Sequence, residues 1–140
     1  MWVIFEGLDK AGMGTLERAF LEATGFKHMV IDRGPAGYLT FDKLFDRVSS
    51  ERTEDFAYHA RKIMESNDFM IVFCFVDDLV AAERLKAHNE TCPYDYAEAQ
   101  TLYAYNVYRF YDYCKVLELD TTNRTVDECV QMIIKKLEEV

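Results

Sequence analysis

A glycine-rich segment near the N-terminus has the composition of a phosphate-binding loop. Residues 7–15 read Gly-Leu-Asp-Lys-Ala-Gly-Met-Gly-Thr, between a short apolar run and a segment of helical periodicity. Such a turn lets backbone N–H groups and a helix N-terminus surround a phosphate. The spacing from Gly7 to Gly12 is that of a P-loop, but Met13 and Gly14 stand where that motif has Lys and Ser or Thr. The pattern indicates either a phosphate site without its usual lysine or a plain turn of the chain.

Further residues could supply the charge and the hydroxyl that this loop lacks. Lys10 offers a cation three residues after the first glycine, and Thr15 offers a hydroxyl one position late. Asp32 and Arg33 directly follow an apolar run, at the strand end where open α/β sheets bind ligands. An arginine can hold a phosphate through two hydrogen bonds, and a neighbouring carboxylate can orient a hydroxyl or a metal-bound water. The alternative for this pair is a surface ion pair.

The elements that must position these residues alternate along the chain. Four apolar runs have the length and composition of strands: 2–5, 28–31, 69–76 and 115–119. Six segments show helical periodicity or helix-capping residues: 15–23, 39–45, 51–66, 77–87, 93–113 and 126–137. Run 69–76 is apolar throughout, as in a strand covered on both faces. The alternation predicts an α/β domain with a parallel sheet and helices on both faces.

Composition excludes several classes of protein. Half of the 140 residues are hydrophobic, which is incompatible with a mainly disordered chain. The net charge of −9 argues against attachment to duplex nucleic acid or an anionic membrane by bulk charge. No apolar run approaches the roughly 18 residues of a membrane span, and no signal peptide is recognisable. The four cysteines show no C-x-x-C spacing, so we expect free thiols and a cytoplasmic protein.

Several of these segments together resemble thymidylate kinases, which are nucleoside monophosphate kinases. Residues 5–12, Phe-Glu-Gly-Leu-Asp-Lys-Ala-Gly, are similar to the first strand and P-loop of that family, and Asp32-Arg33 is similar to its Asp-Arg motif. Run 69–76 with the following residues 83–86, Glu-Arg-Leu-Lys, resembles the strand and helix before the lid. Residues 120–123, Asp-Thr-Thr-Asn, resemble the loop around the adenine of ATP. The resemblance covers most of the chain.

The resemblance implies a three-layer P-loop kinase-like fold, with about four parallel strands in the order 2-1-3-4. It implies one domain over residues 1–140 with a lid reduced to about residues 88–93. ATP and Mg²⁺ would be the cofactors, and a deoxynucleoside monophosphate, with dTMP favoured, would be the acceptor. The implied partners are small-molecule nucleotides and a second copy in a homodimer. By analogy, so short a chain suits the cytoplasm of a virus-infected host cell.

The resemblance also implies roles for individual residues. Catalytic roles fall on Asp9, Lys10, Asp32, Arg33 and Arg84. Binding of the donor nucleotide falls on Gly7, Gly12, Met13, Gly14, Thr15, Lys86, Thr121, Thr122 and Asn123. Acceptor binding falls on Arg33, Tyr38, Arg52 and Tyr96, and metal binding on Thr15 and Asp77. Three of these have structural alternatives: Asp77 as a helix cap, Arg52 in a solvated helical turn, and Tyr96 as a core or interface aromatic.

Met13 leaves a second function open. Phosphoryl transfer depends on positioning and on electrostatic stabilisation of the phosphoryl oxygens, so loss of the central cation should weaken catalysis strongly. Lys10 could cover part of that loss. The alternative is a retired P-loop protein that binds nucleotide or a protein partner without turnover. Kinases that act on a nucleoside, or on a base already in DNA, are a third class.

Overall fold

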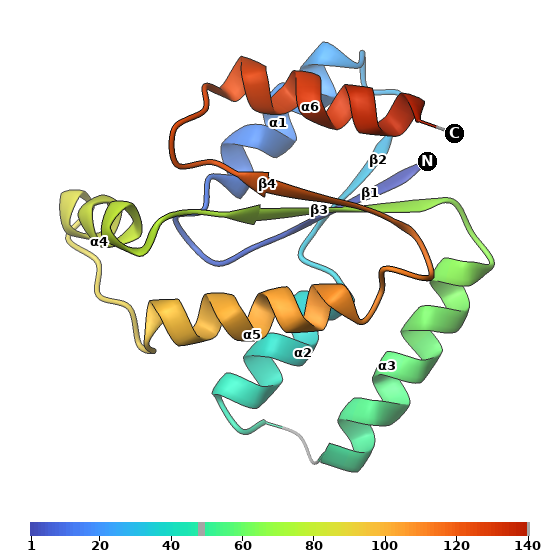
Figure 1. Cartoon of the computed structure of the whole chain (residues 1–140), viewed down its shortest axis with the longest axis horizontal. Coiled ribbons are helices and arrows are strands. Elements are labelled where there is room, and N and C mark those ends of the chain that lie inside the picture. The colour runs from blue at the N-terminus through green and yellow to red at the C-terminus, as the bar shows by residue number, and fades with distance from the viewer. Residues whose placement is uncertain (48–49, 140) are drawn as a thin grey trace.

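The computed structural model describes residues 1–47 and 50–139, and within them four strands form one parallel sheet (Figure 1). The strands are β1 (Trp2–Glu6), β2 (Met29–Asp32), β3 (Phe69–Phe75) and β4 (Lys115–Asp120). Their order is β2-β1-β3-β4, and each neighbouring pair is parallel. The predicted sheet and strand order are confirmed.

Helices cover both faces of the sheet, which gives three layers (Figure 1). On one face lie α1 (Met13–Ala23) and α6 (Val126–Glu138). On the other lie α2 (Pro35–Leu44), α3 (Ser50–Glu65) and α5 (Tyr96–Tyr108), while α4 (Asp78–Ala87) follows the carboxyl end of β3. None of the helices in the described ranges is long and apolar enough to cross a lipid bilayer.

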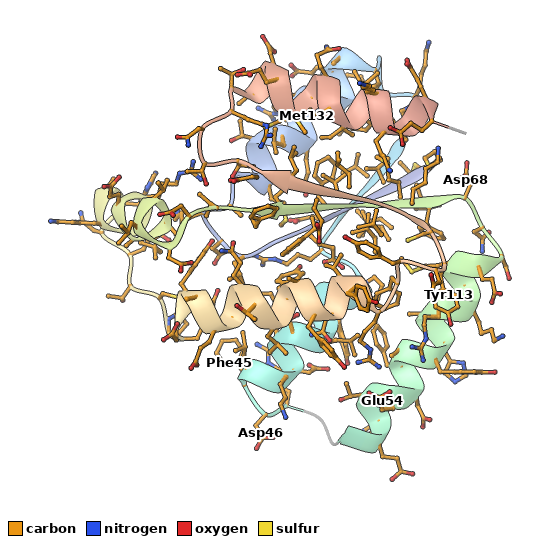
Figure 2. All side chains as sticks on the ribbon, viewed as in Figure 1. Phe45, Asp46, Glu54, Asp68, Tyr113 and Met132 are labelled. Atoms are coloured by element: carbon orange, nitrogen blue, oxygen red, sulfur yellow. The ribbon has the colours of Figure 1, made fainter. Side chains whose placement is uncertain are left out.

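The two central strands are buried on both sides because successive side chains point to opposite faces. Val3, Phe5 and Val72 pack in the hydrophobic cluster under α1 and α6. Ile4 and Phe73 pack in the second cluster, under α2 and α5. Side chains fill the space on both sides of the sheet (Figure 2). This arrangement explains why run 69–76 is apolar without alternation.

Local signals predicted several helix ends, but two helices differ from their predicted ranges. The helix predicted over 39–45 begins at Pro35, which occupies the first turn of α2. Thr125 and Glu128 form the expected capping box of α6, and Asp77 caps α4 by accepting from the Leu79 amide at 2.9 Å. The predicted helix 93–113 is shorter, however, because the Asp95 side chain accepts from Glu98 N and starts α5 at Tyr96. Pro93 therefore lies outside the helix. The four cysteines are free thiols, as predicted.

Candidate functional site

The loop between β1 and α1 has its carbonyl groups bound to other parts of the chain. Four donors from distant segments each take one carbonyl oxygen: Arg33 Nε on Gly7 (3.0 Å), Tyr96 Oη on Asp9 (2.9 Å), Arg84 Nη1 on Lys10 (2.6 Å) and Thr121 Oγ1 on Ala11 (2.7 Å). Because these carbonyls bond side chains from four separate segments, the conformation of the loop is fixed by the rest of the fold.

The amides of the same loop are left for a ligand. Among the described residues, the N–H groups of Gly12, Met13, Gly14 and Thr15 have no acceptor. Gly12 has φ +89°, in the left-handed region, and a Cβ at Gly7 would lie 2.6 Å from the carbonyl oxygen of Cys74. Only glycine fits such a turn without strain. Unpaired amides at a helix N-terminus favour an anion, so the loop offers four hydrogen-bond donors to an anion although it lacks the P-loop lysine.

Arg33 joins this loop to the end of β2. Its Nη2 lies 2.7 Å from Asp9 Oδ1, and its guanidinium stacks 5.0 Å from the centre of the Phe41 ring. Burial disfavours the charged form of Arg33, but the hydrogen bond and the charge of Asp9 outweigh it and raise the pKa of the guanidinium. Arg33 therefore stays charged at the point where β2 ends.

Glu6 is a residue beside the candidate site that the sequence analysis did not identify. Its carboxylate is fully buried and accepts hydrogen bonds from the amides of Gly34 (2.9 Å), Ala36 (2.8 Å) and Gly37 (3.1 Å) and from Tyr103 Oη (2.7 Å). Burial raises the pKa of Glu6, while these donors oppose the rise. The carboxylate fixes the start of α2 against β1 and so positions the Arg33 backbone. The sequence signal that could have identified Glu6 is its position as a single acidic residue directly after the apolar residues 2–5.

Glu17 on α1, also missed, lies beside Asp32. Burial, followed by the charge of Asp32, raises the pKa of Glu17 from its ordinary value of 4.5 to about 7. One of its carboxylate oxygens is buried and has no partner among the described residues. The two carboxyl groups therefore face the same space at the edge of the loop.

The raised pKa of Glu17 predicts a pH-dependent stability. The folded protein holds this proton more tightly than the unfolded chain, so the free energy of unfolding should fall as pH rises from 4.5 to about 7. Because Glu17 is partly exposed, we expect a loss of about 1 kcal/mol. Urea unfolding at about pH 5 and about pH 8 measures it. Glu17→Gln should abolish this contribution, whereas Glu22→Gln on the exposed side of α1 should retain it; equal pH dependence in both variants would contradict the assignment.

Three cavities follow one another along the carboxyl ends of the strands. The loop cavity, of about 280 Å³, lies between residues 8–15 and Asp32-Arg33. The α6 cavity, of about 320 Å³, shares Lys10, Gly12 and Thr15 with it and extends to Thr121 and Arg124. The aromatic cavity, of about 680 Å³, shares Asp9 and Arg33 with it and extends along α2. The loop cavity thus borders the two larger ones and shares lining residues with each.

Aromatic rings from α2, from α3 and from the loops after α2 and before α5 form the wall of the aromatic cavity. Tyr38 and Phe56 lie 4.3 Å apart between ring centres, and Tyr94 packs edge-on against Phe41 and Phe45 at 6.3 and 6.0 Å. Burial raises the pKa of Tyr94 to about 12, so its hydroxyl stays protonated. Of the predicted acceptor residues, this cavity contains Arg33 and Tyr38.

Other predicted residues lie around these cavities or away from them. Arg84 and Thr121 line the α6 cavity, whereas Tyr96 contacts the loop backbone. Lys10 Nζ lies 2.9 Å from Glu90 Oε1, in the segment between α4 and α5.

The predicted residues that no described cavity includes are Gly7, Arg52, Asp77, Lys86, Tyr96, Thr122 and Asn123. Asp77 serves as the helix cap, and its amide donates to Thr122 Oγ1 at 2.8 Å. Asp77 and Thr15 share no cavity among those found in the described residues. Within the described ranges, no group of three or more His, Cys, Asp and Glu side chains is placed to hold a metal ion.

Comparison with known proteins identifies the fold. No protein-family model and no curated protein matches the sequence. The YorR protein from Bacillus subtilis, solved in complex with phosphorylated GDP, matches with a TM-score of 0.75 and 15% identity, over 99% of this chain and 96% of that one. Deoxyadenosine kinase from M. mycoides with bound dATP matches with a TM-score of 0.59 and 13% identity, over 99% and 100%. Its structure with the products dCMP and a flexible dCDP gives 0.58 and 12%, over 100% of both chains. The P-loop kinase-like α/β fold is thereby confirmed.

Proposed function

We propose that this protein is a small nucleotide kinase that transfers the γ-phosphoryl group of ATP to a deoxynucleoside monophosphate. The row of three adjacent cavities carries the proposal. Phosphoryl transfer needs donor, transferred group and acceptor in line, with donors placed around the transferred oxygens. The loop cavity, with its unpaired amides, lies between a cavity for each nucleotide. The resemblance to thymidylate kinases favours dTMP as the acceptor.

Each cavity contributes its own part of the reaction. Thr121 and Arg124 would contact the donor nucleotide in the α6 cavity, and the amides of residues 12–15 would hold its phosphates. Lys10 and Arg84 would supply positive charge, since the Met13 side chain is buried in the hydrophobic cluster under α1 and α6. Arg33 would hold the acceptor phosphate, with Asp9 beside the transferred group.

The residues around the loop cavity also fit Mg²⁺. The Asp32 carboxylate and the Thr15 hydroxyl, which line this cavity, are hard oxygen ligands, and the Glu17 carboxyl group lies beside Asp32. Asp32 and Thr15 would hold the ion, which neutralises charge on the phosphate oxygens when bound. Asp77 is assigned no part in this.

Calorimetric titration with ATP·Mg²⁺, and then with each deoxynucleoside monophosphate, tests the proposal. Formation of ADP and of the deoxynucleoside diphosphate is followed in the same samples. Binding of both nucleotides with turnover is expected. The retired protein is the second candidate, and the pairing of Lys10 with Glu90 favours it because the one nearby lysine is already engaged. Binding of ATP without turnover would support that candidate. Absence of any nucleotide binding would refute the kinase and leave only a retired protein that binds a protein partner.

The Lys10–Glu90 ion pair itself gives a prediction. Removing the acid by Glu90→Gln should free Lys10 for the donor phosphates and tighten ATP binding by about twofold to fivefold, because an exposed ion pair contributes little. Calorimetry of ATP·Mg²⁺ measures this change. Glu83→Gln on α4 is the control and should leave affinity unchanged. Weaker ATP binding in Glu90→Gln would show that the acid supports the donor site.

A further inference from the structure

Asp42 on α2 is buried without a complete set of hydrogen bonds. It is 5% exposed, and its Oδ2 has no partner among the described residues. No ion pair involving Asp42 is found in the described ranges either. A buried carboxylate oxygen without a donor is costly, and natural proteins rarely keep one unless a ligand or water completes it.

The position of Asp42 on α2 places it inside the aromatic cavity. Tyr38, Asp42 and Phe45 follow one another at i, i+4 and i+7, so they share one face of the helix, and all three line that cavity. Arg33 lies just before the start of α2. At 1.5 Å per residue, Asp42 is about 10 Å further along the axis than Pro35, a separation comparable to the length of a nucleoside monophosphate.

The remainder of the cavity wall provides stacking surfaces and positive charge. Phe41, Phe45 and Tyr94 present rings, and the Arg47 guanidinium lies 5.0 Å from the centre of the Phe45 ring. Asp42 also borders a second, more polar cavity, but the Arg109 there is already held by both oxygens of Glu54, at 3.0 and 2.8 Å. Asp42 is thus the acid that lines the aromatic cavity at its far end from Arg33.

We infer that Asp42 reads the acceptor base and selects a base with an exocyclic amino group. The inference rests on the proposed function, with the acceptor phosphate at Arg33 and its base between the rings. A carboxylate only accepts hydrogen bonds, and the amino groups of cytosine, adenine and guanine donate them. Thymine has no amino group: its one ring donor, N3–H, lies between two carbonyl oxygens, which repel a carboxylate that approaches it. The acceptor is therefore an amino-bearing deoxynucleoside monophosphate, in place of dTMP.

Calorimetric titration of the wild-type protein with dCMP, dAMP, dGMP and dTMP, and with ATP·Mg²⁺ separately, tests this inference. At least one amino-bearing nucleotide should bind tenfold or more tightly than dTMP, since a site built around an exocyclic amino group disfavours a base that has a carbonyl oxygen in its place. Asp42→Asn, whose amide can also donate, should bring the ratio of the two dissociation constants close to one. Asp46→Asn, just after α2 (Figure 2), is the matched control and should leave the ratio unchanged.

The outcomes separate the inference from the proposed function. If dTMP binds as tightly as the other three, the inference is overturned while the proposed function stands. If the ratio persists in Asp42→Asn, Asp42 is not the selecting residue and the inference fails. If ATP binds but no monophosphate does, both the inference about Asp42 and the acceptor part of the proposed function are refuted. The wild-type comparison needs no variant, so it decides the question even if Asp42→Asn does not fold.

Discussion

Replacing Arg33 by lysine should lower kcat/KM for phosphoryl transfer by about a thousandfold. Lysine retains the charge but loses the planar fork that bonds Gly7 O and Asp9 Oδ1 at 3.0 and 2.7 Å. The acceptor phosphate then loses its paired donors. The loop also loses the Arg33 hydrogen bond, one of the four that hold its carbonyl groups. Steady-state kinetics with the acceptor identified by calorimetry measures the effect.

A structural role for Arg33 alone is separable from a catalytic one. Arg18→Lys, on the exposed side of α1, is the matched control and should keep full activity. In Arg33→Lys, the thermal midpoint and the affinity for ATP should change little. The lower kcat/KM should come from a higher KM for the acceptor and a lower kcat. If Arg33→Lys retains wild-type kcat/KM, the acceptor phosphate binds elsewhere.

Glu6→Gln should reduce the free energy of unfolding by about 3 kcal/mol. The carboxylate accepts from three amides and the Tyr103 hydroxyl, and glutamine would turn an NH₂ group toward donors that need an acceptor. Urea unfolding followed by circular dichroism gives the value. Glu22→Gln, an exposed change on α1, should stay within about 0.5 kcal/mol of the wild type.

The same substitution links stability to the site. Glu6 positions the start of α2, so Glu6→Gln should also shift Arg33 and weaken acceptor binding in protein that remains folded. An unchanged unfolding midpoint would mean that the donors around Glu6 find other partners, and the carboxylate would not be the element that fixes α2.

The fold could be predicted because its signals are local. The apolar run 69–76, the turn at Gly25 and the capping box at Thr125 each lie within a few residues of the structure they specify. The failure at the start of α5 was also local: Pro93 suits a first helical turn, but the Asp95 side chain provides a stronger start two residues later. Competing local signals of this kind are resolved only by geometry.

The site was predictable only in part, because its contacts join residues far apart in sequence. The glycine-rich loop and the Asp32-Arg33 pair can be recognised in the sequence from their residue types and spacing. Glu6 meets Tyr103 across 97 positions, and Lys10 meets Glu90 across 80, which no periodicity reveals. Asp42 reads in the sequence as an ordinary surface acid on an amphipathic helix. Its burial follows from the packing of α2 against α3 and α5.

The four side-chain hydrogen bonds to the loop carbonyls have a consequence for folding. They come from the end of β2, from α4, from α5 and from the residue after β4, and the last of these lies 110 positions from its acceptor. Contacts of such separation form late, since the intervening chain must first be ordered. The shape of the loop is therefore completed only when β4 is in place. During synthesis, a nascent chain that ends before Thr121 has the glycines of the loop but lacks the hydroxyl that holds the Ala11 carbonyl.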